Sequence, residues 1–422
     1  MNRGLKNRHL QLISLGGIIG SGYFLGTGYV LEKAGPAAIL SYLLGGAIVL
    51  CVMLCLAELA VAEPIAGSFV TYARKYIGPT WACGVGWTYW MTWVSYVPSE
   101  MIAAGIIMNN FLPQISQLWW AVLFGLLVTI VNLFHVDKFG ESEFWLAIIK
   151  IVALIAFSIV GFLIIMGLIG QQGYIGSSIF LGSGGFAPNG YWSIILTMTI
   201  ILVNFQGTEI IGLAAGECKN PEKSIPIAVR NVTWRIIALY GLDRFAALFA
   251  FVVLTAALSC SNSGLYGTSR AMYSLATLGM APKKLAELNK NGMPKNAVLV
   301  SIVSCWFIIL LYSFDASEAV YTYLLALSGF TGAIAWISIC WSQYRFRKQS
   351  VADGSFASLK YKTPFFPYVT LFGIWAQVFC LVVLAFEPDL RESLLVGVPF
   401  LIVPMAIYRV RQWRLRRAAL SH

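Results

Sequence analysis

We single out three of the ionisable residues that lie in or beside long apolar runs of the sequence, where a side chain could bind and release protons. They are Glu100, Lys150 and Glu209. Burial disfavours the charged form of a side chain, so a buried lysine can gain and lose a proton near neutral pH. Ionisable residues at such positions are costly and are usually functional. We therefore expect Lys150 to act as an internal cation or as the proton carrier, and the alternative is that it reaches the membrane surface two turns away. Glu100 either takes part in coupling or makes a structural hydrogen bond.

Glycines interrupt the first apolar run. The segment Gly16-Gly17-Ile18-Ile19-Gly20-Ser21-Gly22 is followed by Gly26 and Gly28. Glycine destabilises a helix interior by about 0.5–1 kcal/mol relative to alanine. An unwound stretch would expose backbone amides at the positive end of the following half-helix, where a carboxylate can bind. The alternative is close helix packing through small residues.

A second interruption occurs in the sixth apolar run, at Asn204-Phe205-Gln206-Gly207-Thr208-Glu209. Unwinding at Gly207 would release the carbonyl groups of residues 203–206, beginning with Val203, to accept hydrogen bonds from an ammonium group. Interruptions in the first and sixth spans are what an inverted repeat of five helices would give. A further polar cluster, Ser259, Ser261, Asn262 and Ser263, follows the run from Phe245, and its members either serve the site or bond a neighbouring helix.

Composition places the chain among membrane proteins. Of 422 residues, 59% are hydrophobic and 11% charged, whereas soluble domains are about half apolar and a quarter charged. The apolar runs have the length of about 20 residues that a membrane-spanning helix needs, and barrel strands would instead give short alternating segments. We therefore expect an all-α integral membrane protein. The expected spans are 10–30, 37–61, 82–108, 118–133, 143–165, 192–215, 245–267, 297–314, 320–343, 368–386 and 394–408.

Several function classes are excluded. The net charge of +11 lies in short loops between apolar runs, which reflects membrane topology and predicts no nucleic-acid partner. The eight cysteines form no CxxC pair, the histidines stand in loops or at the end of the chain, and no GK[ST] phosphate-binding run occurs. We expect no metal, no cofactor, no ATP-driven pumping and no enzyme activity.

Positive charge predicts the orientation. Lys and Arg gather at alternate connections, which places those connections and both termini in the cytoplasm. These are the N-terminus, 74–75, 138, 219–230, 283–295, 345–348 and the tail from 409.

One stretch does not fit this pattern. An even number of crossings must separate the basic connections before Val232 and after Arg270, and two full crossings need about 40 apolar residues. The stretch from Val232 to Leu242 supplies about half a crossing before Asp243 and Arg244. Either this leg re-enters the membrane from one side, or a piece of an ancestral sequence is missing.

The motifs together resemble the amino acid permeases of the amino acid/polyamine/organocation superfamily, and the resemblance runs from Leu5 to the basic tail. The branch most similar includes S-methylmethionine and neutral amino acid permeases. The motifs that carry the resemblance are Ser14 to Gly22, Ala57-Glu58-Leu59-Ala60, Glu143-Phe144-Trp145 with Lys150, Phe205 to Glu209, and Asn262-Ser263-Gly264-Leu265-Tyr266.

The resemblance implies a LeuT-like fold in one transmembrane domain, 1–422. Two inverted five-helix repeats would occupy 10–165 and 192–343, the second incomplete near 240–245, and two accessory helices would occupy 368–408. Helices 1 and 6 would be broken, with nominally twelve spans. Family members carry a complete seventh helix and a long outer loop where this chain reads Tyr240 to Phe245, so a truncated seventh span is expected.

The resemblance also implies roles for individual residues. Ser21 and Gly22 would hold the substrate carboxylate, and Phe205 would cover the substrate side chain. Backbone carbonyls would meet the ammonium group, and they belong to Ile18, Val203 and Gln206. Lys150 would fill the place where sodium-coupled relatives bind sodium, near Ser259 and Ser263, so protons become the coupling ion. Glu209 and Glu100 would tune or relay that proton.

We therefore expect a proton-coupled symporter in the inner membrane of a bacterial-type cell, whose partners are a small amino acid, the proton and the lipid bilayer. A neutral α-amino acid or a compound like S-methylmethionine is the expected substrate. Two alternatives remain: an amino acid exchanger without proton coupling, and a transport-inactive sensor or remnant that binds amino acid without moving it.

Overall fold

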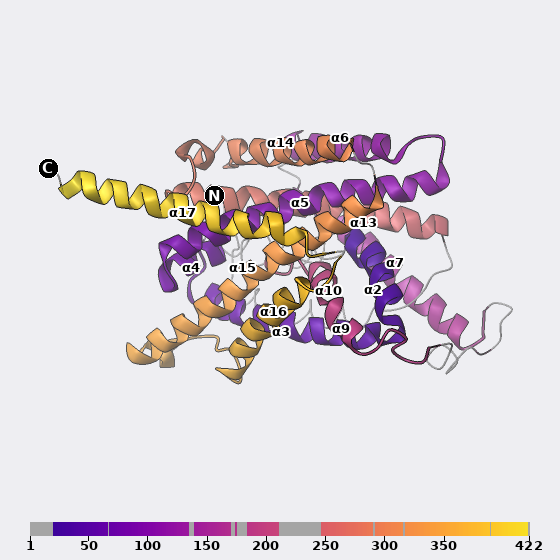
Figure 1. The fold of residues 1–422 in the computed structure, drawn as a ribbon, viewed down its shortest axis with the longest axis horizontal. Coiled ribbons are helices and arrows are strands. Elements are labelled where there is room, and N and C mark those ends of the chain that lie inside the picture. The colour runs from indigo at the N-terminus through magenta and orange to yellow at the C-terminus, as the bar shows by residue number, and fades with distance from the viewer. Residues whose placement is uncertain are drawn as a thin grey trace.

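The computed structural model describes residues 20–65, 67–134, 139–169, 174, 184–210, 246–289, 292–314, 317–388 and 390–420. Every regular element in these ranges is a helix (Figure 1). In the first half they are the π-helix η1 (Gly22–Gly26), α2 (Thr27–Ala34), η2 (Gly35–Ala37), α3 (Ala38–Ala62), α4 (Ser68–Tyr76), α5 (Pro79–Phe111), α6 (Gln117–Phe134) and α7 (Phe139–Ile165). In the second half they are α9 (Trp192–Leu196), α10 (Met198–Asn204), α13 (Ala246–Thr277), η5 (Lys283–Ala286), α14 (Lys295–Tyr312), α15 (Glu318–Ala352), η6 (Ser355–Ser358), α16 (Tyr368–Leu384) and α17 (Ser393–Leu420).

The helix α5 is the centre of the bundle and packs against α13, α15, α6 and α17. Most of its residues are buried, including Trp93, Tyr89 and Tyr96. Gly264 of α13 makes the crossing with α5 possible, because a Cβ there would lie 2.5 Å from a ring atom of Trp93. Close approach through a residue without a side chain is a common way for membrane helices to pack.

The outer helices present apolar side chains to their surroundings, as a protein in lipid does. Phe307 and Val303 of α14 and Ile402 and Ile407 of α17 are more than half exposed. In the described part of the chain, four helical segments have the length and composition to cross a membrane: 22–62, which contains more than one helix, and 295–312, 319–352 and 393–419. The chain is therefore a multi-pass membrane protein.

Three helices continue well beyond the predicted spans, among them α15, which ends at Ala352 whereas its predicted span ends at 343. The span predicted to end at residue 267 belongs to α13, which ends at Thr277, and the last predicted span ends at 408 whereas α17 ends at Leu420. The predicted spans are membrane crossings defined by apolar residues, and these helices continue past them because a helix can continue into water. Ser259 and Ser263 accordingly lie inside α13. The shortened stretch 232–245 and residues 211–215 lie outside the described residues, so the truncated span stays a prediction.

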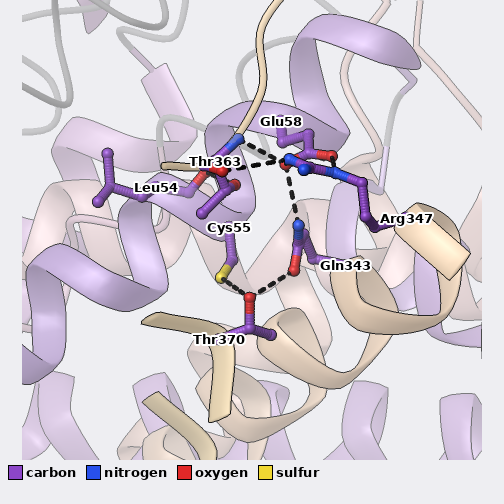
Figure 2. A network of polar contacts seen from close by, with 7 residues as sticks. All are labelled: Leu54, Cys55, Glu58, Gln343, Arg347, Thr363 and Thr370. Carbon is purple, nitrogen blue, oxygen red and sulfur yellow. Dashed lines mark hydrogen bonds and ion pairs between the residues drawn. The ribbon is translucent and has the colours of Figure 1, made fainter. Parts of the chain in front are cut away.

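A buried polar network ties α3 to α15 at one end of the bundle (Figure 2). The Glu58 carboxylate on α3 accepts hydrogen bonds from Arg347 Nε at 2.6 Å and Gln343 Nε2 at 2.9 Å, both on α15. It also forms an ion pair with Arg347 Nη2 and accepts the backbone N–H of Thr363 at 2.7 Å. Glu58 is fully buried and the Arg347 side chain is 6% exposed. A buried carboxylate is tolerated when it is paired and hydrogen-bonded in this way.

The network extends to α16 and to the connection before it. The Thr370 hydroxyl donates to Gln343 Oε1 at 2.8 Å, and the Thr363 hydroxyl donates to the Leu54 carbonyl at 3.0 Å. Three segments distant in sequence are therefore joined by one set of hydrogen bonds: α3, the C-terminal part of α15, and residues 363–370.

Candidate substrate site

The described part of the first glycine-rich segment, from Gly20 onward, lies against the second expected interruption. The helix α10 ends at Asn204, and residues 205–209 form turns with Gly207 at a φ of 99°. A φ in this range strongly favours glycine, which explains the residue at this position. Facing this turn is η1, because a Cβ at Gly22 or Gly26 would lie 3.0 or 3.3 Å from Asn204 Oδ1. The backbone of η1 thus approaches the end of α10 as closely as glycine allows.

Glu100 of α5 holds the start of η1. Its two carboxylate oxygens accept the backbone N–H of Ser21 at 2.8 and 3.0 Å, and both residues are fully buried. Gly20 gives the carboxylate its space: a Cβ there would overlap Glu100 Oε1 and would lie 2.7 Å from the Tyr96 hydroxyl. The structural hydrogen bond considered for Glu100 therefore exists, and it lies at the glycine-rich segment.

Buried polar atoms without a partner of hydrogen-bond geometry gather around η1. Among the described residues they include Ser21 Oγ, Asn204 Oδ1 and Tyr321 OH. The other end of the Asn204 amide is fixed, since its Nδ2 donates to Tyr42 OH at 2.6 Å. A buried polar group left unsatisfied costs about 1–3 kcal/mol, so these atoms indicate a place where a polar ligand or water binds.

A cavity of about 230 Å³ adjoins η1. Its wall includes Leu25 and Gly26 of η1, Ile200 of α10 and Tyr321 of α15. Glu32 lies at its rim and is exposed. The cavity therefore leads from the surface toward the buried Tyr321.

Residues 205–209, the turn after α10, are hydrogen-bonded to α15 through Gln206. Gln206 Nε2 donates to the Ser328 carbonyl at 2.8 Å, and the Ser328 hydroxyl donates to Gln206 Oε1 at 2.7 Å. Within the turn, the Val203 carbonyl accepts the Gln206 N–H at 2.9 Å. The Phe205 ring lies 6.4 Å from the Tyr42 ring and is buried.

The Glu209 carboxylate accepts hydrogen bonds from two neighbouring helices and from its own turn. It accepts the hydroxyl of Tyr89 at 2.9 Å and the indole N–H of Trp336 at 3.1 Å. The backbone N–H of Gly207 lies 3.1 Å from its Oε2. The carboxylate thereby fixes the turn between α5 and α15.

Lys150 of α7 is fully buried, and its ammonium group donates to Ser259 Oγ of α13 at 2.8 Å. Its charge also interacts with Glu100. The alternative in which Lys150 extends to the membrane surface is therefore wrong, because a partner inside the bundle holds it. Ser263 lies one turn further along α13, buried and with an unpaired hydroxyl. Ile18 lies outside the described residues.

Tyr42, Tyr96 and Tyr321 belong to this site although the sequence analysis did not select them. Each stands within an apolar run, where tyrosine is ordinary, and nothing in its spacing marks it. The only available signal was the polar Asn204 at the second interruption, which requires a partner when buried. In the described part of the chain, no group of three or more His, Cys, Asp or Glu is placed to hold a metal ion.

Comparison with known proteins now identifies the family. The amino acid permease family model matches residues 9–243 and 241–414. The amino-acid permease RocC of Bacillus subtilis is 39% identical, and the alignment covers 97% of this chain and 94% of that protein. The lysine-specific permease LysP of Escherichia coli is 35% identical over 96% of this chain and 92% of its own, and the gamma-aminobutyric acid permease of B. subtilis is 34% identical over 99% and 96%.

The alignment with RocC extends over 447 positions, more than the 422 residues of this chain, so some aligned positions have no residue here. Among solved structures, a manganese transporter of Eremococcus coleocola shares the fold with a TM-score of 0.54 at 12% identity, over 97% of this chain and 94% of that one. The likeness shows a shared helical fold, and the family match with its relatives confirms the resemblance seen in the sequence motifs. The chain is a member of the amino acid permease family of the amino acid/polyamine/organocation superfamily.

Proposed function

We propose that this permease imports an amino acid together with a proton by alternating access, in which the site opens first to one side of the membrane and then to the other. The observation that carries the proposal is the contact between η1 and the end of α10. There, the buried Ser21 Oγ and Asn204 Oδ1 have no partner of full hydrogen-bond geometry, beside a cavity that leads to the surface. A hydroxyl that can donate and an amide oxygen that accepts suit the carboxylate and the ammonium group of an amino acid.

The substrate would lie between the two interruptions, with the roles given by the family resemblance. Ser21 and Gly22 bind the carboxylate, and the carbonyls of Ile18, Val203 and Gln206 receive the ammonium group. Phe205 covers the side chain of the substrate. The two interruptions act as breaks in helices 1 and 6 of two inverted repeats, 10–165 and 192–343, followed by the accessory helices of 368–408.

Proton coupling is assigned to Lys150. Its ammonium group lies against Ser259 and interacts with Glu100, and Glu100 holds the backbone at Ser21. A change in the charge of Lys150 would therefore alter the electrostatic environment of Glu100, whose carboxylate holds the backbone that binds the substrate. Ser263 would complete the surroundings of the ammonium group, and Glu209 would keep the turn after α10 in place.

The basic connections define the orientation that we propose. Both termini, α4 and the C-terminal ends of α15 and α17 would face the cytoplasm of a bacterial-type cell, because Lys and Arg concentrate there. The buried Glu58–Arg347 pair would then lie on the cytoplasmic side. The cavity beside Tyr321 would open outward, so the described conformation would be closed toward the cytoplasm.

A second candidate function is amino-acid binding without transport. The family match is divided at residues 241–243, and the alignment with RocC contains positions that this chain lacks. If those positions form most of a seventh span, the chain would bind amino acid and fail to move it. We favour transport, because the site around η1 and the Lys150–Ser259 contact lie outside that stretch.

The test is uptake by the purified full chain in proteoliposomes with an imposed inward proton gradient. The labelled compounds are neutral amino acids and S-methylmethionine, with lysine, histidine and gamma-aminobutyrate added because relatives bear those names. We expect a neutral amino acid to accumulate and a protonophore to abolish the accumulation. Uptake only into liposomes preloaded with amino acid would instead indicate an exchanger, and binding without uptake would indicate a sensor.

Substitution of Gly20 by alanine is expected to abolish binding of the amino acid. The new Cβ would overlap the Glu100 carboxylate, which would have to leave the Ser21 amide. Gly28→Ala is the matched control, because a Cβ at Gly28 meets nothing within 4 Å and alanine favours the helix α2. Binding can be measured by scintillation proximity. Equal affinities of the two variants would show that the backbone of η1 does not form the site.

A further inference from the structure

A second concave site is lined by residues other than those of the candidate substrate site. It is a groove of about 520 Å³ between the first residues of α5 and the C-terminal part of α17. Pro79 and Thr80 line one side, and Arg409, Trp413 and Arg416 line the other. The three α17 residues recur at intervals of four and three, so they share one face of the helix.

The groove is strongly basic. The C-terminal part of α17 carries arginines and no acidic residue from position 409 onward, with arginine at 409, 411, 414, 416 and 417. Neither Arg409 nor Arg416 forms an ion pair with a described residue, and both are exposed. Arg417 is stacked on the Trp413 ring at 3.9 Å, which fixes the indole beside the groove. Two unpaired guanidinium groups at one concave surface match a phosphate, which arginine binds through paired hydrogen bonds.

The position of the groove along α17 corresponds to a membrane surface. Residues 393–408 carry no charge, and a helix from Ser393 completes one crossing of about 20 residues near Gln412. Arg409 and Arg416 are seven residues apart, which is about 10 Å along the axis. They therefore flank the level at which lipid headgroups begin. Trp413 lies between them with half of its surface exposed, as tryptophans at membrane surfaces do.

We propose that this groove binds the headgroup of an anionic phospholipid. Arg409 and Arg416 bind the phosphate, and the acyl chains lie along the exposed apolar face of α17. In Figure 1 this part of α17 projects beyond the rest of the bundle, so lipid can reach it from the side. In the orientation proposed above, the lipid belongs to the cytoplasmic leaflet. The bound lipid joins α17 to the beginning of α5, the central helix of the bundle.

The test is the affinity of the purified full chain for phosphatidylglycerol, measured by native mass spectrometry as that lipid is titrated into micelles containing phosphatidylcholine. We expect retention of phosphatidylglycerol in preference to phosphatidylcholine. Arg409→Gln/Arg416→Gln should weaken it on the order of thirtyfold, because two direct hydrogen-bonded contacts to the phosphate are lost. The matched control is Arg411→Gln/Arg414→Gln, which removes the same charge from the same helix but no side chain that lines the groove.

Thr80→Trp provides a test without a change in charge, since it fills the groove from the α5 side and should also release the lipid. Equal weakening by both double variants would overturn the proposal in favour of unspecific attraction to a basic helix. Equal retention of phosphatidylglycerol and phosphatidylcholine would also overturn it. Displacement of the lipid by an equal concentration of glycerol 3-phosphate would assign the groove to a soluble phosphate. None of these measurements requires transport, so they stand apart from the uptake assay.

Discussion

Replacement of Lys150 by methionine is expected to abolish uptake driven by a proton gradient while leaving amino-acid binding measurable. Methionine occupies similar space and cannot carry a charge, so the contact with Ser259 Oγ is lost and Glu100 no longer interacts with an ammonium group. The backbone amide of Ser21 still has its carboxylate acceptor, which is why binding should persist. Uptake into proteoliposomes with and without the gradient, together with equilibrium binding, measures the two properties separately.

Lys283→Met is the control for this experiment, because Lys283 is exposed on η5 and the substitution changes the net charge equally. It should transport like the unaltered chain. Gradient-driven uptake by the Lys150→Met variant would contradict the assignment of coupling to this residue. It would direct attention to Glu100, for which Glu100→Gln is the corresponding substitution.

Replacement of Glu58 by alanine is expected to destabilise the protein by about 3–5 kcal/mol, the usual cost of removing one partner from a buried ion pair. The substitution leaves the Arg347 guanidinium buried without its carboxylate and removes the acceptor of Gln343 and of the Thr363 N–H. Unfolding in detergent by heat, followed by tryptophan fluorescence, measures the effect. The paired control is Glu63→Ala, whose carboxylate binds the half-exposed Lys75 and accepts the Tyr76 hydroxyl and which should cost about 1–2 kcal/mol.

A double substitution separates the charge from the packing. Glu58→Leu/Arg347→Met removes both charges and fills much of the same space, and such replacements are often neutral or stabilising. We expect it to recover most of the stability lost in Glu58→Ala. If Glu58→Ala unfolds at the same temperature as Glu63→Ala, the network does not stabilise the fold.

The positions of the helices were largely predictable, because a crossing of the membrane requires a run of apolar residues and each run is visible in the sequence. The predicted spans 37–61 and 118–133 coincide with α3 and α6 to within a residue or two. The ends of α13 and α17 were not predictable by the same argument. Their last turns lie beyond the apolar runs. The helical hydrogen bonds of the backbone continue there, but the side chains no longer give an apolar signal in the sequence.

The partners within the site were less accessible to sequence reasoning. Glu58 and Arg347 are separated by 289 positions and Asn204 and Tyr42 by 162, and no local periodicity relates residues so far apart. Ser259 was linked to Lys150 only through the family resemblance, and this contact is present in the structure. By contrast, the glycines of η1 and Gly207 were conspicuous because glycine is unfavourable inside a helix.

The length of α15 imposes a mechanical condition on any change of conformation. One continuous helix carries Tyr321 beside the substrate cavity and Arg347 in the network with Glu58, and these two residues are about 39 Å apart along its axis. If α15 tilts as a rigid helix about Tyr321, Arg347 moves by about 0.7 Å for each degree of tilt. Donor–acceptor distances of N–H···O hydrogen bonds lie within about 2.7–3.2 Å, a range of only about half an ångström. Helices α3 and α15 must therefore tilt as one body, or the carboxylate and the guanidinium must separate within the first few degrees of motion.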